Sequence, residues 1–129
     1  MSAAMEFGMF DWVDRGTKSV GDLYESRLRL IESADQAGFY GYHLAEHHST
    51  PLGMAPSPSV FFGALAQRTK NIRFSPMAYL LPMYHPVRLA EEICMLDHIS
   101  GGRLDVGVGR GISPHEIGFY GVTPDDRQE

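Results

Sequence analysis

The segment that decides the fold is His85–Gly111, whose sequence is HPVRLAEEICMLDHISGGRLDVGVGRG. Pro86 suits the first turn of a helix, where a missing N–H costs no hydrogen bond, and Gly101 suits the left-handed backbone that ends one. Beyond that glycine, apolar residues alternate with polar residues and glycine, which predicts a strand over Arg103–Val108. Arg110 follows where this strand ends. Ligands of α/β proteins bind beyond the carboxyl ends of strands, so the segment predicts an α/β fold with a candidate binding residue.

The same strand–helix plan recurs along the whole chain. Strands are predicted over Met5–Val13, Tyr40–Ala45, Ile72–Leu81 and Arg103–Val108, with starts 35, 32 and 31 residues apart, which is the length of a βα unit. Consecutive units of this kind form a parallel sheet, either open or curled into a barrel, and the local pattern does not separate the two. Pro76 predicts a bulge, a bend or an edge within the third strand.

Helix signals lie between the predicted strands. Asp22 and Glu25 have the spacing of a capping box at the start of the first helix, which Gly38 ends. Ser57 followed by Pro58 predicts the start of the second helix. In each helix, apolar residues recur every three or four positions, so one face is expected to be buried. The side chains predicted to face inward are Tyr24, Leu28, Ile31, Ala34, Val60, Phe61, Ala64, Leu65, Leu89, Ala90, Ile93 and Leu96.

Length and composition limit the class of protein. The chain of 129 residues is one domain at most, and 43% apolar with 21% charged residues is typical of a globular protein. The net charge of -5 argues against a nucleic-acid partner, because phosphate binding needs clustered Lys and Arg. No stretch approaches the ~20 apolar residues of a membrane span, and no signal-peptide pattern is visible, so no membrane partner is expected.

Cys94 is the single cysteine. It permits no internal disulfide and favours a reducing, cytoplasmic setting. Because Cys94 lies in the apolar part of a helix pattern, a packing role is expected rather than a reactive thiol.

The last residues carry the signals of a helix start. Thr123 suits an N-cap and Pro124 the first turn, with two aspartates placed favourably for the helix dipole. The sequence ends at Glu129, about one turn later. We therefore expect residues 1–129 to be a single domain that is the N-terminal part of a longer protein.

Acid–base side chains follow the second predicted strand. Glu46, His47 and His48 are adjacent, and histidine suits proton transfer because its pKa lies near neutrality. A metal site is the alternative, since the chain has six histidines. Two features weaken it: adjacent strand residues point to opposite faces, and no H-E-x-x-H motif or cysteine pair is present.

The glycines around Arg110 permit the close approach of a flat ring or a phosphate, or they merely turn the chain. The segment lacks the G-x-G-x-x-G spacing of a dinucleotide-binding loop, and Ile112–Pro114 is not expected to open a helix at once. Met77, Ala78 and Tyr79 either line a flat apolar pocket or fill the sheet.

Three motifs together resemble the bacterial luciferase-like, flavin-dependent monooxygenases. They are AEHH at Ala45–His48, LPMYHPVRLAEE at Leu81–Glu92, and LDHISGGRLDVGVGRG at Leu96–Gly111. The similarity extends over essentially the whole chain. Members of this family are (β/α)₈ TIM barrels, so the resemblance implies a chain that forms about the first half of such a barrel.

The resemblance also implies a cofactor and a reaction. Members bind reduced FMN, supplied by a flavin reductase, or in a sister group a reduced deazaflavin. With FMN they use O₂ to oxidise a small organic substrate. By match of motif His47 is the catalytic histidine, and Pro76 stands where the family commonly has a small residue. The residues assigned to the cofactor are Glu46 beside the flavin, Met77 and Ala78 in a bulge beneath its ring that often has a non-proline cis peptide, and Arg110 and Arg127 near its phosphate.

Three functions remain open from the sequence: the N-terminal portion of an FMN-dependent monooxygenase, a deazaflavin-dependent oxidoreductase, and a non-catalytic half-barrel assembly module. A half barrel has two open sheet edges and an uncovered face, which favour pairing with other chains. The chain is therefore expected to form a homo-oligomer and to be inactive as a monooxygenase by itself.

Overall fold

The computed structural model describes residues 5–111 and 113–123. Strands and helices alternate along the chain, as the sequence predicts. The elements are β1 (Gly8–Asp11), α1 (Val20–Gln36), β2 (Gly41–Leu44), α2 (Pro58–Arg68), β3 (Arg73–Pro76), β4 (Tyr79–Leu80), the 3₁₀ turn η1 (Leu81–Met83), α3 (Pro86–Ser100), β5 (Val108–Gly109) and α4 (Pro114–Gly118).

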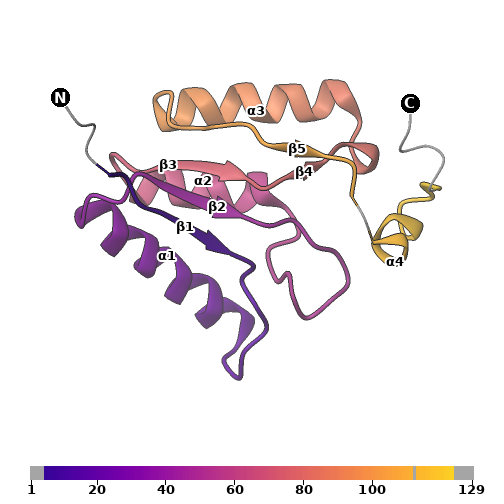
Figure 1. Ribbon diagram of the computed structural model, residues 1–129, viewed down its shortest axis with the longest axis horizontal. Coiled ribbons are helices and arrows are strands. Elements are labelled where there is room, and N and C mark those ends of the chain that lie inside the picture. Colours follow the sequence, from indigo (N-terminus) through magenta and orange to yellow (C-terminus); the bar gives the residue numbers. More distant parts are fainter. Residues whose placement is uncertain (1–4, 112, 124–129) are drawn as a thin grey trace.

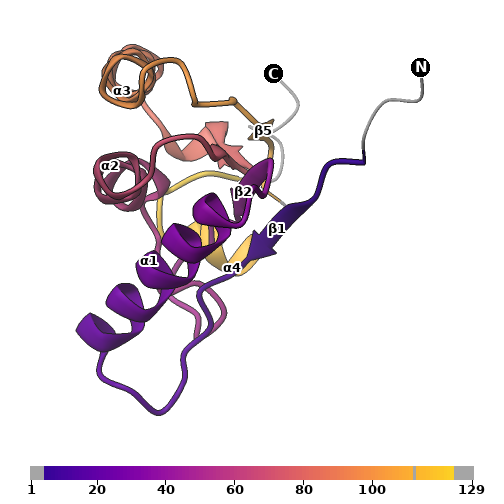
Figure 2. The ribbon, with the colours of Figure 1, turned by 90° about the vertical axis from the view of Figure 1, so that its left-hand side faces the viewer.

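All strand pairs in the described residues are parallel. One sheet has the order β1-β2-β3, and a second pairs β4 with β5. An isolated bridge from Phe74 to Leu104 joins the last segment to β3. Helices α1, α2 and α3 lie on one side of this curved array, and α4 lies beyond the ends to which the strands point (Figures 1 and 2). The α/β fold with consecutive parallel βα units is therefore confirmed and corresponds to part of a barrel.

The core fills the space between the helices and the strands. Alternate strand residues point toward the helices, including Tyr42, Leu44 and Phe74, and each of these three is fully buried. Ile31 of α1 and Phe62 of α2 belong to the same core cluster as these strand residues. Phe10 points to the opposite side of β1 and is 52% exposed. The helix side of the sheet is thus packed and the other side is open.

The third strand is interrupted where proline predicts a break. Strand β3 ends at Pro76, the peptide bond between Met77 and Ala78 is cis, and the chain pairs again from Tyr79. Of the bulge, bend or edge expected at Pro76, the structure has a bend at Met77, and the non-proline cis peptide implied by the resemblance is present.

Two expectations about helix starts and strand extent are wrong. The N-cap of α1 is Ser19, whose Oγ accepts a hydrogen bond from the Asp22 N–H at 3.1 Å, so Asp22 is the third residue of the helix and not its cap. The predicted fourth strand is reduced to the bridge at Leu104 and to β5. Val106 and Val108 are 48% and 57% exposed because no element of the described chain covers this outermost strand.

Some side chains predicted to face inward are exposed. Val60 and Ala64 lie on the outer side of α2, because its buried stripe is rotated by one residue toward Phe62 and Ala66. On α3, Ala90 and Cys94 are exposed, since Leu89 and Leu96 define the buried side. The packing role expected for Cys94 is therefore wrong.

Asp35 ties the end of α1 to the start of β3. Its buried carboxylate accepts backbone N–H groups of Lys70 at 2.7 Å, Asn71 at 2.9 Å and Ile72 at 2.7 Å. Burial alone would raise the pKa of Asp35, but these three donors outweigh it and hold the pKa below its ordinary value. The ionised form is therefore the one that stabilises the fold.

We expect Asp35→Asn to lower the free energy of unfolding by about 2–4 kcal/mol, because it weakens charge-assisted hydrogen bonds at a buried site. In the unchanged protein this contribution is present above about pH 4 and lost as the pH falls through the lowered pKa of the folded state. Urea unfolding at pH 7 and pH 3 measures both effects. The exposed Asp14→Asn is the control, and equal stability of the two variants at pH 7 would contradict the assignment.

Candidate active site

A hollow of about 260 Å³ lies where β1, β2, β4 and β5 end. It collects residues that are far apart in the sequence, and it includes five of the six residues predicted for the site. The sixth, Arg127, is outside the described residues. The hollow is lined by Phe10, Trp12, Ala45, Glu46, His47, Met77, Ala78, Leu80, Gly109, Arg110, Gly111, Ser113 and Glu116.

His47 is held by a carboxylate from the opposite wall of the hollow. Its Nδ1 lies 3.1 Å from Oε1 of Glu116, and its side chain is 30% exposed. Glu116 is buried, and its Oε2 accepts the backbone N–H of His48 at 3.3 Å. An ionised carboxylate only accepts hydrogen bonds, so toward ionised Glu116 the Nδ1 of His47 is the donor.

A second network lies beneath the hollow and centres on Glu46. The Glu46 Oε1 lies 2.8 Å from His48 Nε2, while Oε2 accepts hydrogen bonds from the Tyr84 hydroxyl at 2.9 Å and the Leu80 N–H at 3.3 Å. On the far side of the imidazole, the Tyr120 hydroxyl lies 2.7 Å from His48 Nδ1. Both Glu46 oxygens are thus engaged inside the protein, which fixes the end of β2 to β4 and to the segment after α4.

The two tyrosines of this network remain protonated near neutral pH. Burial, and next the charge of Glu46 with its hydrogen bond, raise the pKa of Tyr84 well above its usual range. Burial and then Glu46 raise the pKa of Tyr120 as well. The Tyr84 hydroxyl therefore donates its proton to Glu46, and the protonated Tyr120 hydroxyl forms a hydrogen bond with His48 Nδ1.

The break between β3 and β4 forms one wall of the hollow, and two glycines permit it. A Cβ on Gly107 would lie 2.4 Å from the carbonyl oxygen of Pro76, and one on Gly109 would lie 3.3 Å from the Cβ of Ala78. The backbone after α3 thus packs directly against the break. Met77 is 55% exposed beside it.

Arg110 follows these glycines and is exposed at the edge of the hollow. Within residues 5–111 and 113–123, no carboxylate forms a salt bridge with it. Its guanidinium is therefore available to an anion.

His47 and His48 engage different carboxylates, Glu116 and Glu46, as their opposite directions predict. In the described part of the chain, no three His, Cys, Asp or Glu side chains gather as metal ligands. No helix there is long and apolar enough to cross a membrane.

Sequence reasoning missed Glu116, Tyr84 and Tyr120. It also missed α4, which begins at Pro114 directly after its N-cap Ser113, so the expectation that no helix opens here is wrong. The available signal was the S-x-x-E spacing of Ser113 and Glu116, a capping box. The Ser113 Oγ accepts the Glu116 N–H at 3.3 Å as in that motif, but the Glu116 carboxylate turns to His47 instead of back to the cap.

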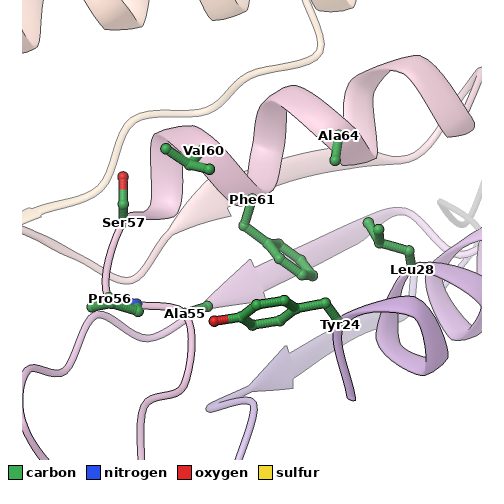
Figure 3. A pocket seen from close by; sticks show the side chains of 8 residues that line it. All are labelled: Tyr24, Leu28, Ala55, Pro56, Ser57, Val60, Phe61 and Ala64. Carbon is green, nitrogen blue, oxygen red and sulfur yellow. The ribbon is translucent and has the colours of Figure 1, made fainter. Parts of the chain in front are cut away.

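A larger apolar hollow of about 310 Å³ lies between α1 and α2 (Figure 3). The rings of Tyr24 and Phe61 meet edge to face with their centroids 6.4 Å apart, and Leu28, Val60 and Ala64 also line the hollow. None of the side chains lining it is charged, and the Tyr24 hydroxyl is already bonded to the Met54 carbonyl. The side chains suited to acid–base chemistry, Glu46, His47 and Glu116, line the other hollow.

Comparison with known proteins identifies the chain's relatives. Residues 5–129 match the family model of the luciferase-like monooxygenases. The protein y4wF of Sinorhizobium fredii is 48% identical over 125 residues, which cover 97% of this chain and 36% of that protein. The 4-hydroxyprotoasukamycin monooxygenase of Streptomyces nodosus subsp. asukaensis is 39% identical over 99 residues, which cover 77% of this chain and 27% of that protein.

A solved structure of the oxygenating constituent of 3,6-diketocamphane monooxygenase from Pseudomonas putida, in complex with FMN, superposes with a TM-score of 0.88. It is 34% identical and covers 94% of this chain and 34% of that one. The chain thus spans about a third of the length of these relatives. It belongs to the luciferase-like monooxygenase family.

Proposed function

We propose that this chain forms the His47-bearing portion of an FMN-dependent monooxygenase that uses O₂ to oxidise a small organic substrate. The observation that carries the proposal is the pairing of His47 with buried Glu116 in a hollow whose other wall is the break at Met77–Ala78. An acid–base group and a flat apolar wall thus face one space. These are the two elements that a flavin reaction requires of its protein.

The residues present fit the cofactor. Apolar Met77, Ala78 and Leu80 offer a surface for a flat ring, and Gly109 brings the backbone within close range of that surface. Arg110 offers charge and a fork of donors for a phosphate. A hollow of about 260 Å³ is smaller than the ~300–1,000 Å³ of complete ligand pockets, which agrees with a site that needs further walls.

The roles of the chain's own residues follow from this placement. Reduced FMN supplies the oxygen-activating chemistry when it is bound. Arg110 would hold the phosphate, and Met77 with Ala78 would support the ring. Neutral His47 would accept or return a proton at Nε2. Glu46 lines the same hollow, and its carboxylate, bonded within the interior network, would hold the end of β2 in place beside the ring.

We also propose conditions for activity. The face of the sheet opposite the helices carries exposed Phe10 and Trp12, and oxygen chemistry on a reduced flavin needs water to be excluded. The chain by itself is therefore expected to be inactive and to associate through this face, with another copy or another chain. A flavin reductase and a cytoplasmic setting complete the proposal.

A deazaflavin is the competing cofactor, and binding separates the two. We expect this chain to bind FMN with a Kd in the roughly micromolar-to-millimolar range, because a few charge-assisted contacts carry the affinity. Arg110→Ala should weaken FMN binding by about 10–100-fold, the value of one charged hydrogen bond. Isothermal titration with FMN and with a deazaflavin measures both.

Arg29→Ala is the control for that titration, because Arg29 is exposed on α1, pairs with Glu25 and is not among the residues that line the hollow. Tighter binding of the deazaflavin than of FMN would show that FMN is not the cofactor. FMN affinity that is unaffected by Arg110→Ala would overturn the phosphate assignment.

A further inference from the structure

We propose that Glu116 is a positioning residue that sets which ring nitrogen of His47 carries the proton. The inference rests on the proposed function for its catalytic consequence, but the proton assignment itself does not depend on the cofactor. Three observations on the described residues support it. The Glu116 carboxylate contacts His47, the same carboxylate contacts the His48 backbone, and Glu116 stands in a capping box without bonding back to the cap.

The contact is a buried carboxylate facing one ring nitrogen. Glu116 is 6% exposed, and its Oε1 and Oε2 lie 3.1 Å and 3.4 Å from His47 Nδ1. An ionised carboxylate has no proton to donate, so the pair is satisfied only when Nδ1 carries the hydrogen. The neutral ring then has its lone pair on Nε2. Because His47 lines the hollow, this leaves a proton acceptor at the site.

The second contact fixes how the carboxylate is turned. Oε2 of Glu116 accepts the backbone N–H of His48 at 3.3 Å, and a backbone N–H can only donate. The atom of residue 116 that faces the His48 N–H must therefore be an oxygen. Of the two oxygens, Oε1 is the nearer to His47 Nδ1, at 3.1 Å against 3.4 Å for Oε2, so the chemical nature of the atom at the Oε1 position decides the tautomer of the ring.

The sequence of α4 shows that this placement is not the default for a glutamate at this position. Glu116 is three residues after the N-cap Ser113, where a glutamate ordinarily bonds back to the N–H of the capping residue. Here the Ser113 Oγ keeps its half of the motif, while the carboxylate reaches His47 and His48, 69 and 68 residues earlier in the chain. A contact made at the expense of the local cap points to a role at the site.

Glu116→Gln tests the proposal, because the new amide has one oxygen and one NH₂ group. The His48 N–H keeps the oxygen on its own side, so the NH₂ group faces His47 Nδ1 and can only donate to it. His47 must then accept at Nδ1 and carry its proton on Nε2. We expect the tautomer of His47 to invert from Nδ1–H to Nε2–H.

Long-range ¹H–¹⁵N correlation spectra of the ¹⁵N-histidine-labelled chain, recorded at about pH 8.5 where imidazole is neutral, read the tautomer directly. Glu91→Gln is the matched control, because Glu91 is exposed on α3 and should leave the His47 signals unchanged. Backbone amide spectra of each variant establish that the fold is kept. A His47 tautomer that is Nε2–H in the unchanged protein, or that does not change in Glu116→Gln, would overturn the proposal.

In an active form of the enzyme that includes residues 1–129, Glu116→Gln should lower kcat by about 10²-fold or more while the affinity for FMN changes less than threefold. Inverted tautomer with unchanged kcat would overturn the catalytic part of the inference. Failure of the unchanged protein to bind FMN would instead count against the proposed function and leave the tautomer result standing.

Discussion

Replacement of His47 by alanine should lower turnover by about 10²–10⁴-fold in an active form of the enzyme that includes this chain. In the proposed function the imidazole is the acid–base group of the hollow, and its Nδ1 contact with Glu116 would leave Nε2 to take a proton. Flavin affinity should change far less, because the proposed function assigns the phosphate and the ring to other residues. Steady-state oxygenation assays, together with FMN titrations of the same samples, separate the two effects.

His115→Ala is a suitable control for this experiment. His115 is an exposed histidine on α4 whose ring packs against Phe119 and does not line the hollow. Its removal should leave turnover within about twofold. Full turnover in His47→Ala, on the substrate that the enzyme oxidises, would show that His47 is a structural residue.

Gly107→Ala should be among the most damaging single-methyl changes in the chain. The new Cβ would lie 2.4 Å from the carbonyl oxygen of Pro76, and both atoms belong to backbone that cannot move without displacing the break at Met77–Ala78. We expect a loss of about 3 kcal/mol or more in the free energy of unfolding. The fraction of Gly107→Ala that folds should also bind FMN more weakly, because Met77 and Ala78 at this break form the apolar wall of the hollow. Urea unfolding and FMN titration measure the two losses.

Gly63→Ala provides the matched control. Gly63 lies within α2, and a Cβ there would meet nothing within 4 Å. Because alanine is the better helix former, this variant should be more stable by about 0.5–1 kcal/mol. Equal stability of Gly107→Ala and the unchanged protein would mean that the segment after α3 does not pack against Pro76 as described.

Local sequence signals predicted the order of elements well, because each is set by residues close in the chain. Pro86 and Gly101 bound α3, and Pro76 marks the end of β3. Side-chain burial was predicted less well. The inward stripe of α2 is displaced by one residue, because burial depends on which elements pack against a helix from elsewhere in the chain.

Some residues of the candidate site could likewise be predicted from local sequence, and others could not. His47 and Arg110 could be predicted from the sequence because each lies within three residues of the end of a strand. Glu116 could not be, because its contact joins residues 69 positions apart, and its spacing from Ser113 suggested only a helix cap. The role of Glu46 as the centre of a buried network likewise depends on Tyr84 and on a helix-flanking tyrosine that only the fold brings near.

The central claim is that FMN binds this chain at the hollow beside His47. An amide chemical-shift map of the ¹⁵N-labelled chain, titrated with FMN up to about 5 mM to cover weak binding, tests it most directly. We predict that the perturbed amides cluster at residues 46–48, 77–80 and 109–111, and that Arg110→Ala reduces these shifts. Perturbations at the apolar hollow between α1 and α2 instead, or none at the three segments, would contradict the account.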